Sequence, residues 1–315
     1  MLKRQYHQPV MLKEAIMLLD IKKGGIYVDA TLGGGGHAQK VLEEIGSHGT
    51  LIGMDQDQAA IEHCRELFRN QKNIILEQAN FRDLSRILDQ RKIKEIDGIL
   101  FDLGVSSYQL ETAERGFSFS QDGPLDMRMD RSQGLTAADL VNSIGLKDLA
   151  QVIEDYGEER WAKKIARNIV SAREHCRIDS TSALADIVAG SIPRSKWPDN
   201  IHPATRTFQA LRITVNNELS VLKPALSTAI RFLKNRGRIV VISFHSLEDR
   251  IVKNTLVDFS RGCICPPKLP ICVCGHTAEI RILTKKPLQA QDEEIVSNPR
   301  SRSAKMRAGE RIANG

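Results

Sequence analysis

Two acidic residues near the start of the chain flank a run of glycines. Asp29 ends an apolar segment at residues 26–29, Gly33 to Gly36 follow, and Asp55 comes directly after a second apolar segment at residues 50–54. Glycines let the backbone adopt positive φ and let a ligand approach closely, and the free N–H groups of a following helix favour a polar or anionic group. A carboxylate about 20 residues further on can accept hydrogen bonds from ribose hydroxyls. This stretch therefore predicts a site for a nucleoside cofactor.

These residues leave more than one cofactor open. Gly33, Gly35 and Ala38 formally fit the Gly-x-Gly-x-x-Ala fingerprint of NAD sites, whereas no Gly-Lys-Ser/Thr follows the glycines as it would in a P-loop. Asp29 favours S-adenosylmethionine, because a carboxylate before the loop would repel a pyrophosphate but can hold the cationic methionine amine. A glycine-rich turn without a ligand is the remaining alternative.

Asp102 is the candidate catalytic residue. It lies near the end of an apolar segment, residues 96–103, and is followed by Leu-Gly-Val. Amino-methylating enzymes carry a short Asp/Asn-Pro-Pro-aromatic segment at this place, since acceptors on the N–H groups of an exocyclic amine localise its lone pair toward a methyl sulfonium. The two prolines are missing here, but the carboxylate is present. Methylation of a pyrimidine carbon would need a cysteine nucleophile at this strand end, and the sequence has none there.

Alternating strands and helices must position these residues. The expected strands are residues 26–29, 50–54, 73–76 and 96–103, and the expected helices between them are residues 37–45, 57–69 and 83–90. This alternation predicts an α/β fold with a parallel, doubly wound sheet that binds its ligand outside the carboxyl ends of the strands. Phe81 would stand at that edge, where its ring could cover an adenine or pack in the core. Residues 103–109 are expected to form a turn.

The alternation stops after the fourth strand, which predicts an inserted domain. We expect a first part of the cofactor domain at residues 1–110, a helical insertion that handles the substrate at 111–205, and a second part at 206–315. In that second part, a helical stripe from Phe208 should stop near Pro224, a strand should return at residues 237–244, and residues 279–283 should form the last strand. The basic residues of 297–315 predict an exposed tail, either solvated or in contact with RNA.

Two further groups of residues could do chemistry. His245 follows the strand at 237–244 and could be a base, although a loop histidine is more often a hydrogen-bonding partner. Cys263, Cys265, Cys272 and Cys274, with His276 nearby, could bind zinc, but Cys-x-Cys is tighter than the usual zinc spacing. We therefore expect no metal, and reduced cysteines that pack in the loop.

Composition narrows the class of protein. The chain has 315 residues, 45 Lys and Arg against 39 Asp and Glu, a formal net charge of +6 and 41% hydrophobic residues. These values are typical of a soluble globular protein, and the positive charge permits a polyanionic partner. No apolar run is long enough to span a membrane, and the first residues lack a signal-peptide core. We expect no membrane partner and a cytoplasmic location.

Long and unusual motifs are distributed along nearly the whole chain. They are residues 29–37 (DATLGGGGH), 97–107 (DGILFDLGVSS), 114–119 (ERGFSF), 123–130 (GPLDMRMD), 206–213 (RTFQALRI), 243–250 (SFHSLEDR) and 298–303 (NPRSRS). Together they resemble the MraW/RsmH family of bacterial ribosomal RNA methyltransferases. The paired Cys-x-Cys elements also resemble the family pattern. The resemblance implies a Rossmann-like methyltransferase fold with an inserted helical domain, and S-adenosylmethionine as cofactor.

The resemblance also implies a substrate and a set of site residues. The substrate would be N4 of a cytidine in the decoding region of 16S ribosomal RNA, either free or in the small ribosomal subunit. The cofactor would be held by Gly35, Gly36, His37, Asp55, Phe81, Asp102 and Gln109. Asp102 as the amine acceptor is our own inference.

Several alternatives stay open at this point. The charged loop at residues 123–130 could close over the cofactor or a flipped base, or Asp126, Arg128 and Asp130 could simply pair with one another. A NAD-dependent enzyme and a non-catalytic RNA-binding factor are the other functions to test. A homodimer is compatible with the sequence.

Overall fold

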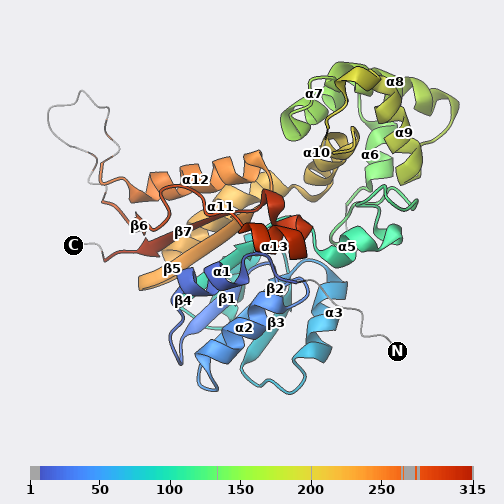
Figure 1. Ribbon diagram of the computed structural model, residues 1–315. Coiled ribbons are helices and arrows are strands. Elements are labelled where there is room, and N and C mark those ends of the chain that lie inside the picture. Colours follow the sequence, from blue (N-terminus) through green and yellow to red (C-terminus); the bar gives the residue numbers. More distant parts are fainter. Residues whose placement is uncertain are drawn as a thin grey trace. The chain divides into compact units, whose positions relative to one another are not determined.

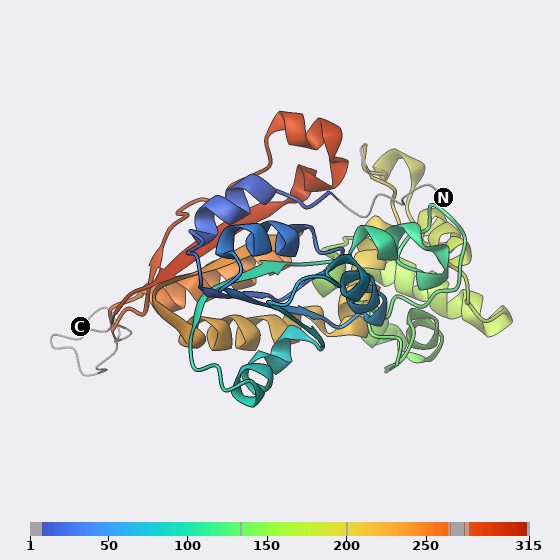
Figure 2. The same cartoon turned by 90° about the horizontal axis from the view of Figure 1, so that it is seen from below.

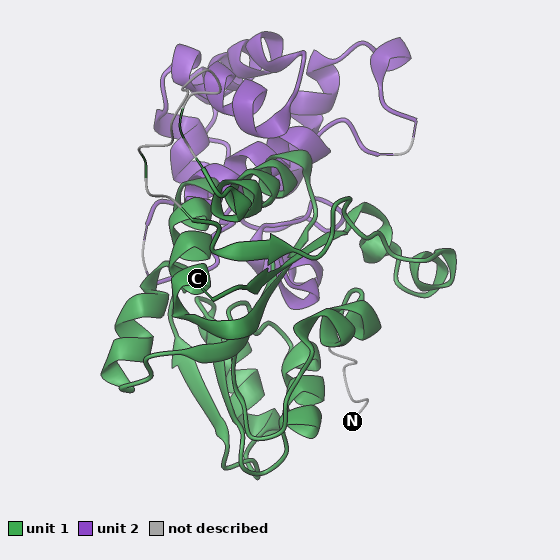
Figure 3. Cartoon of the chain, turned by 90° about the vertical axis from the view of Figure 1, so that its left-hand side faces the viewer, with its two compact units in different colours: residues 1–104, 219–315 green, residues 105–218 purple. Residues whose placement is uncertain are grey.

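The computed structural model describes residues 8–132, 134–199, 201–263, 265, 274 and 277–313. The chain divides into two compact units, one made of residues 1–104 and 219–315 and the other of residues 105–218 (Figure 3). The boundaries expected from the sequence, 111 and 205, both fall inside the second unit. That this unit handles substrate stays a prediction.

A seven-stranded sheet forms the centre of the first unit (Figure 1). Its order is β3-β2-β1-β4-β5-β7-β6, and its strands are β1 Ile26–Asp29, β2 Thr50–Asp55, β3 Ile74–Gln78, β4 Ile96–Asp102, β5 Leu233–Ser243, β6 Ile280–Ile282 and β7 Lys305–Arg311. The first five strands are parallel, and β7 runs antiparallel to both β5 and β6. The order reverses between β1 and β4, and such a switch point is where doubly wound sheets bind ligands.

Helices cover both faces of this sheet (Figure 2). The helices of the unit are α1 Leu12–Leu19, α2 Gly36–Ile45, α3 Gln58–Leu67, α4 Leu84–Gln90, α11 Glu218–Phe232, α12 Ser246–Ser260 and α13 Asp292–Ser297, with 3₁₀ turns η1 Phe81–Asp83 and η4 Pro299–Ser303. Alternate strand residues face opposite layers. Ile99 and Phe101 pack in the core that contains α4, α11 and α12, whereas Leu100 packs in the core that contains α1, α2 and α3. The predicted strand–helix alternation is confirmed.

The second unit is helical and has its own core. Its helices are α5 Ser107–Glu111, α6 Ala137–Ser143, α7 Leu146–Gly157, α8 Ala162–His175, α9 Thr181–Ser191 and α10 Thr205–Asn216, with 3₁₀ turns η2 Ala113–Arg115 and η3 Arg194–Lys196. Apolar residues at helical spacing, such as Ile165 and Ile169 of α8, are fully buried in this core. None of the helices described in either unit is both long enough and apolar enough to cross a bilayer.

The predicted helix stop at Pro224 is wrong. The break falls at Asn217, which adopts the left-handed conformation (φ 52°) between α10 and α11, and Pro224 lies inside α11. An interior proline costs about 3 kcal/mol. Here, Leu222, Ala225 and Leu226 are buried against the sheet, and the carbonyl that loses its N–H donor belongs to the exposed Ser220. Packing therefore outweighs the helix-breaking tendency of proline.

The prediction of an exposed basic tail is wrong for residues 305–311. These residues form β7 inside the sheet, and their cations are paired with acids from other elements. The Arg307 guanidinium donates to both carboxylate oxygens of Asp249 at 2.6 and 3.2 Å, and Arg311 pairs with Glu279. Glu310 accepts from Arg238. Residues 306–310 are all buried, so this segment is a strand inside the sheet and not a solvated tail.

In the loop at residues 123–130 the predicted pairing holds for Asp126 and Arg128, whereas the Asp130 carboxylate accepts from Ser132. The Asp126 carboxylate accepts from Nε and Nη2 of Arg128 at 2.8 and 3.0 Å and from the Arg128 N–H. Burial raises the pKa of Asp126, but the hydrogen bonds and charge of Arg128 outweigh this effect and hold the pKa below its ordinary value. Asn216 bonds to the N–H of Met129 and the carbonyl of Met127. The loop is therefore tied down within its own unit.

Candidate cofactor and catalytic site

The glycine loop connects β1 to α2 and is shaped by close packing. Gly35 is the N-terminal cap of α2 at φ 79°, and a Cβ there would lie 3.0–3.1 Å from side-chain atoms of Phe68, Cys64 and Leu67. A Cβ on Gly36 would lie 2.9 Å from Pro9. Gly33 has a φ of 50°, and a Cβ there would meet only the Thr31 carbonyl oxygen, at 3.9 Å. Gly35 and Gly36 are thus required because a side chain there would collide with α3 and Pro9. The prediction from the sequence gave a different reason, the close approach of a ligand.

Asp55 connects this loop to the end of β2. Its Oδ2 accepts the Gly33 N–H at 2.8 Å, and its Oδ1 accepts the Asp57 N–H at 2.8 Å. A carboxylate has about four lone-pair sites and can accept several hydrogen bonds at once. Asp55 therefore has the position and chemistry expected for a ribose contact, which stays a prediction.

Asp102 lies at the carboxyl end of β4 with one buried oxygen unsatisfied. Its backbone N–H donates to Thr31 Oγ1 at 2.6 Å, which fixes the strand end against β1. Its Oδ2 lies 3.7 Å from His37 Nδ1, and its Oδ1 is buried without a hydrogen-bond partner among the described residues. Such a group is costly unless something binds to it. The unsatisfied oxygen is where a ligand donor would be expected.

His37, in the first turn of α2, lies between Asp102 and the segment before α1. Its Nε2 is 3.1 Å from the Val10 carbonyl, so Nε2 is assigned as the protonated nitrogen, and Nδ1 faces Asp102. The ring is buried. The structure thus brings His37 and Asp102 together, as required if both are to contact one cofactor.

Three carboxyl groups meet at the ends of three neighbouring strands. Asp29 on β1 lies between Asp55 on β2 and Asp102 on β4, and its Oδ1 accepts the Thr31 N–H at 3.2 Å. Burial, opposed by this bond and assisted by the charge of Asp55, raises the pKa of Asp29 from 3.8 to about 7. Burial, together with the charges of Asp29 and Glu248, raises the pKa of Asp102 well above its ordinary value. The site is therefore suited to a cation.

The carboxyl group of Glu248 also acts on Asp102, and this neighbour was not predicted from the sequence. Glu248 is buried in the first turn of α12, and its Oε2 accepts the N–H groups of Phe244 and His245 at 2.8 and 3.3 Å. His245 is the N-terminal cap of α12, with Nε2 3.2 Å from Glu248 Oε1. This arrangement is a capping box. Its spacing, a cap residue followed by a glutamate three positions later, could have been recognised in the sequence. His245 thus has the hydrogen-bonding role that the sequence favoured.

Phe81 and Gln109 have structural contacts of their own. Phe81, in η1 after β3, packs edge-on against Phe101 with ring centroids 5.8 Å apart. Gln109 belongs to the second unit, where its side chain accepts the Ser106 N–H at 3.0 Å in a capping box. The turn expected at residues 103–109 is wrong beyond Ser106, because α5 begins there. Cofactor contacts of Phe81 and Gln109 stay predictions.

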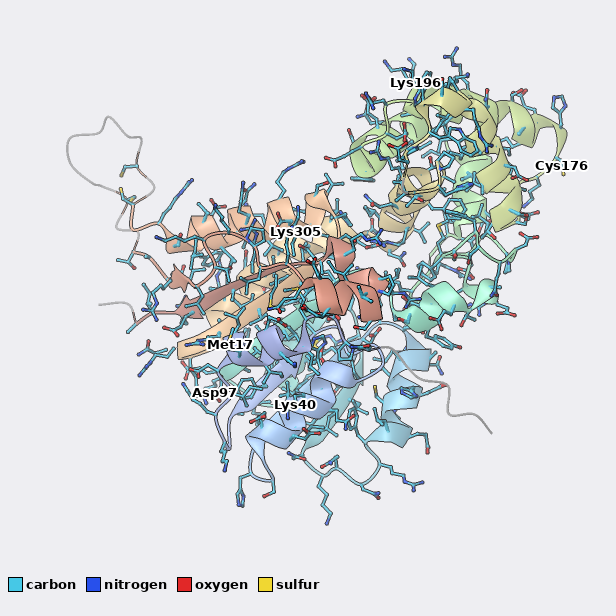
Figure 4. The ribbon with its side chains drawn as sticks, in the orientation of Figure 1. Met17, Lys40, Asp97, Cys176, Lys196 and Lys305 are labelled. Atoms are coloured by element: carbon cyan, nitrogen blue, oxygen red, sulfur yellow. The ribbon has the colours of Figure 1, made fainter. Side chains whose placement is uncertain are left out.

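The two aspartates of β4 have separate roles. Asp97 lies at the start of the strand (Figure 4), and its Oδ2 accepts the Ile26 N–H and the Lys234 ammonium, both at 2.8 Å. It joins β1, β4 and β5 at the end opposite to Asp102.

Cys64 is buried beside the glycine loop, and burial raises the pKa of its thiol, as expected for a core cysteine and not for a nucleophile.

A doubly wound sheet with a reversed strand near one edge and carboxylates at its switch point defines a Rossmann-like nucleoside-cofactor fold. The profile of the MraW methylase family matches residues 4–312. The chain belongs to this family. S-adenosylmethionine, the cofactor expected from the sequence, agrees with a methylase family and with the cation-binding character of the site.

Relatives match along their full length. Proteins named "Ribosomal RNA small subunit methyltransferase H" are 54% identical in Geotalea uraniireducens, over 98% of this chain and 99% of the relative, and 47% identical in Halothermothrix orenii, over the same shares. Among solved structures, a putative rRNA methylase from Clostridium thermocellum is 12% identical, with a TM-score of 0.46 over 97% of this chain and 99% of its own.

Proposed function

We propose that this chain transfers a methyl group from S-adenosylmethionine to the exocyclic N4 of a cytidine in the decoding region of small-subunit (16S) ribosomal RNA. The names of the full-length relatives support small-subunit ribosomal RNA as the substrate. The position on the base and the decoding region come from the motif resemblance described above. The cytoplasmic location, and a homodimer, stay predictions.

The observation that carries the cofactor proposal is the group of buried carboxyls at Asp29, Asp55 and Asp102. The raised pKa values of Asp29 and Asp102 mean that their ionised forms lack compensating positive charge. S-adenosylmethionine has a sulfonium and an ammonium group, and either would stabilise these carboxylates. The pyrophosphate of NAD would instead add negative charge to them.

The residues of the glycine loop would hold this cofactor. We propose that Gly35 and Gly36 position the start of α2 beside it, that Asp55 accepts from its ribose, and that Phe81 covers its adenine. His37 would contact it next to Asp102. Gln109, in the other unit, is retained from the motif resemblance.

Asp102 would perform the chemistry on the substrate. When bound, S-adenosylmethionine supplies an electrophilic methyl group. The unsatisfied Oδ1 of Asp102 would accept an N–H of the target amine, which turns the nitrogen lone pair toward that methyl group. Thr31 holds the backbone of Asp102 in place, and His37 limits the movement of its second oxygen. A carboxylate acceptor requires Asp102 to be ionised, which a bound cation favours.

Exposed cations on α8 support an RNA partner for the second unit. Lys163, Lys164 and Arg167 are all exposed. The Lys164 ammonium lies 5.8 Å from the centre of the Trp161 ring. Cations next to an aromatic ring are a common arrangement for binding a nucleic acid backbone and its bases.

The test is methylation of unmethylated small subunits with isotopically labelled S-adenosylmethionine, followed by nucleoside mass spectrometry. Label in N4-methylcytidine is expected for the wild type. Asp102→Asn should lose at least about 100-fold in rate because an amide is a weaker acceptor. Asp89→Asn, an exposed aspartate on α4, is the matched control and should keep full activity. Label in another nucleoside, or none despite cofactor binding, would contradict the proposal.

A further inference from the structure

Three cysteine sulfurs gather in the segment between α12 and β6. The Sγ atoms of Cys263, Cys265 and Cys274 all lie within 4.8 Å of one another, and those of Cys263 and Cys274 are 3.7 Å apart. The Cys265 N–H donates to Cys263 Sγ at 3.4 Å. N–H donors to sulfur are typical of thiolate ligands, whose charge they stabilise.

Burial does not support the interpretation of these residues as packing cysteines. Cys263 is exposed, and Cys265 and Cys274 are only partly buried. A cysteine that packs as a small apolar residue is enclosed, as Cys64 is in this chain. The cluster needs another explanation.

The spacing of the sulfurs distinguishes a metal site from a disulfide. A disulfide would need an S–S distance of about 2.05 Å. Two thiolates of a tetrahedral zinc site, each about 2.3 Å from the metal, are about 3.8 Å apart. The 3.7 Å between Cys263 and Cys274 is too long for a disulfide and is short enough for both sulfurs to bind one zinc ion.

We propose that Cys263, Cys265 and Cys274 bind a zinc ion through their thiolates. Thiolates favour zinc among the common divalent cations, and each thiol would release its proton to solvent on binding. Cys272 and His276, which the sequence analysis grouped with these residues, lie outside the described residues.

The metal would bind between two chain positions, residues 259 and 279, that are already connected by a backbone hydrogen bond. The Glu279 N–H donates to the Phe259 carbonyl at 2.8 Å, which brings the end of α12 next to the start of β6. The thiols lie between these two positions in the sequence. Zinc would therefore cross-link residues 263, 265 and 274 next to this hydrogen bond, and none of them belongs to the cofactor site.

The first test is the metal content of the full-length protein, purified under reducing conditions and measured by plasma mass spectrometry. About one equivalent of zinc is expected. The triple variant Cys263→Ser, Cys265→Ser, Cys274→Ser should lose it. Cys176→Ser, at an exposed cysteine of the second unit, is the matched control and should retain it.

Cobalt substitution gives a second readout that does not depend on the folding of a variant. Wild-type protein with zinc replaced by Co²⁺ should show thiolate-to-cobalt charge-transfer absorption. Reduced wild-type protein that binds neither zinc nor cobalt would overturn the proposal. So would zinc retained by the triple variant, or a disulfide among these cysteines in the freshly purified protein.

Discussion

Replacing Asp29 by asparagine should stabilise the ligand-free protein at high pH. The pKa of Asp29 is raised from 3.8 to about 7 in the folded state, so folding favours the protonated carboxyl. The stability that this preference contributes is complete below about pH 4 and is lost as the pH rises through about 7. Asparagine cannot ionise, and its side-chain oxygen can still accept the Thr31 N–H.

The size of the effect follows from the pKa shift. About three pKa units at about 1.4 kcal/mol each give about 4 kcal/mol as an upper bound near pH 8. Near pH 4 the variant and the wild type should be about equally stable. The difference between the two proteins should thus grow with pH and become constant once Asp29 is ionised in both states.

Urea-dependent hydrogen exchange of peptides from β1 and β4 is the suitable assay, because it reports the opening free energy of the first unit separately from the second. Asp89→Asn, on the exposed side of α4, should show no such pH-dependent gain. A stability difference between Asp29→Asn and wild type that stays constant from pH 4 to 8, or that has the opposite sign, would refute the argument that Asp29 is buried without compensating charge.

Two further substitutions test the packing of the site. Gly35→Ala should lose about 2–5 kcal/mol in urea unfolding, from left-handed strain plus contact with Phe68, Cys64 and Leu67, whereas Gly24→Ala, at φ 75° in open space, should lose only about 1–2 kcal/mol; equal losses would remove the packing argument. Thr31→Val removes the acceptor of the Asp102 N–H and should cost about 1–3 kcal/mol in hydrogen exchange of β4, and unchanged exchange there would mean that the bond contributes nothing.

Local patterns in the sequence were sufficient to predict most helices and strands of the first unit. Short apolar segments, a glycine turn and helical spacing predicted β1, α2, β2 and β4 nearly to the residue, because each pattern acts within a few positions. The helix expected from residue 57 is α3, and Asp57 is its N-terminal cap, whose Oδ1 accepts the Ala59 N–H. The convergence of Asp29, Asp55 and Asp102 also followed, since carboxyl ends of parallel strands meet at one edge.

The errors concern contacts between distant residues. The charges of β7 look like a solvated tail until Asp249 and Glu279 are known to lie beside them. Pro224 looks like a helix stop until the burial of its neighbours is known. Glu248 was missed as a neighbour of Asp102 because 146 positions separate them in the sequence. The capping box at Ser106 and Gln109 differs from these, because its spacing was visible and was read as a turn.

The place of β7 also bears on how the nascent chain folds. The first unit is discontinuous, and β7 lies between β5 and β6, so one edge of β5 stays unpaired until the segment at 305–311 has been synthesised. An open strand edge is prone to pair with other chains. The inserted unit, by contrast, is continuous and can form its core earlier during translation. Truncation before β7 should therefore leave an aggregation-prone polypeptide, although the carboxyl groups of the cofactor site all precede that strand.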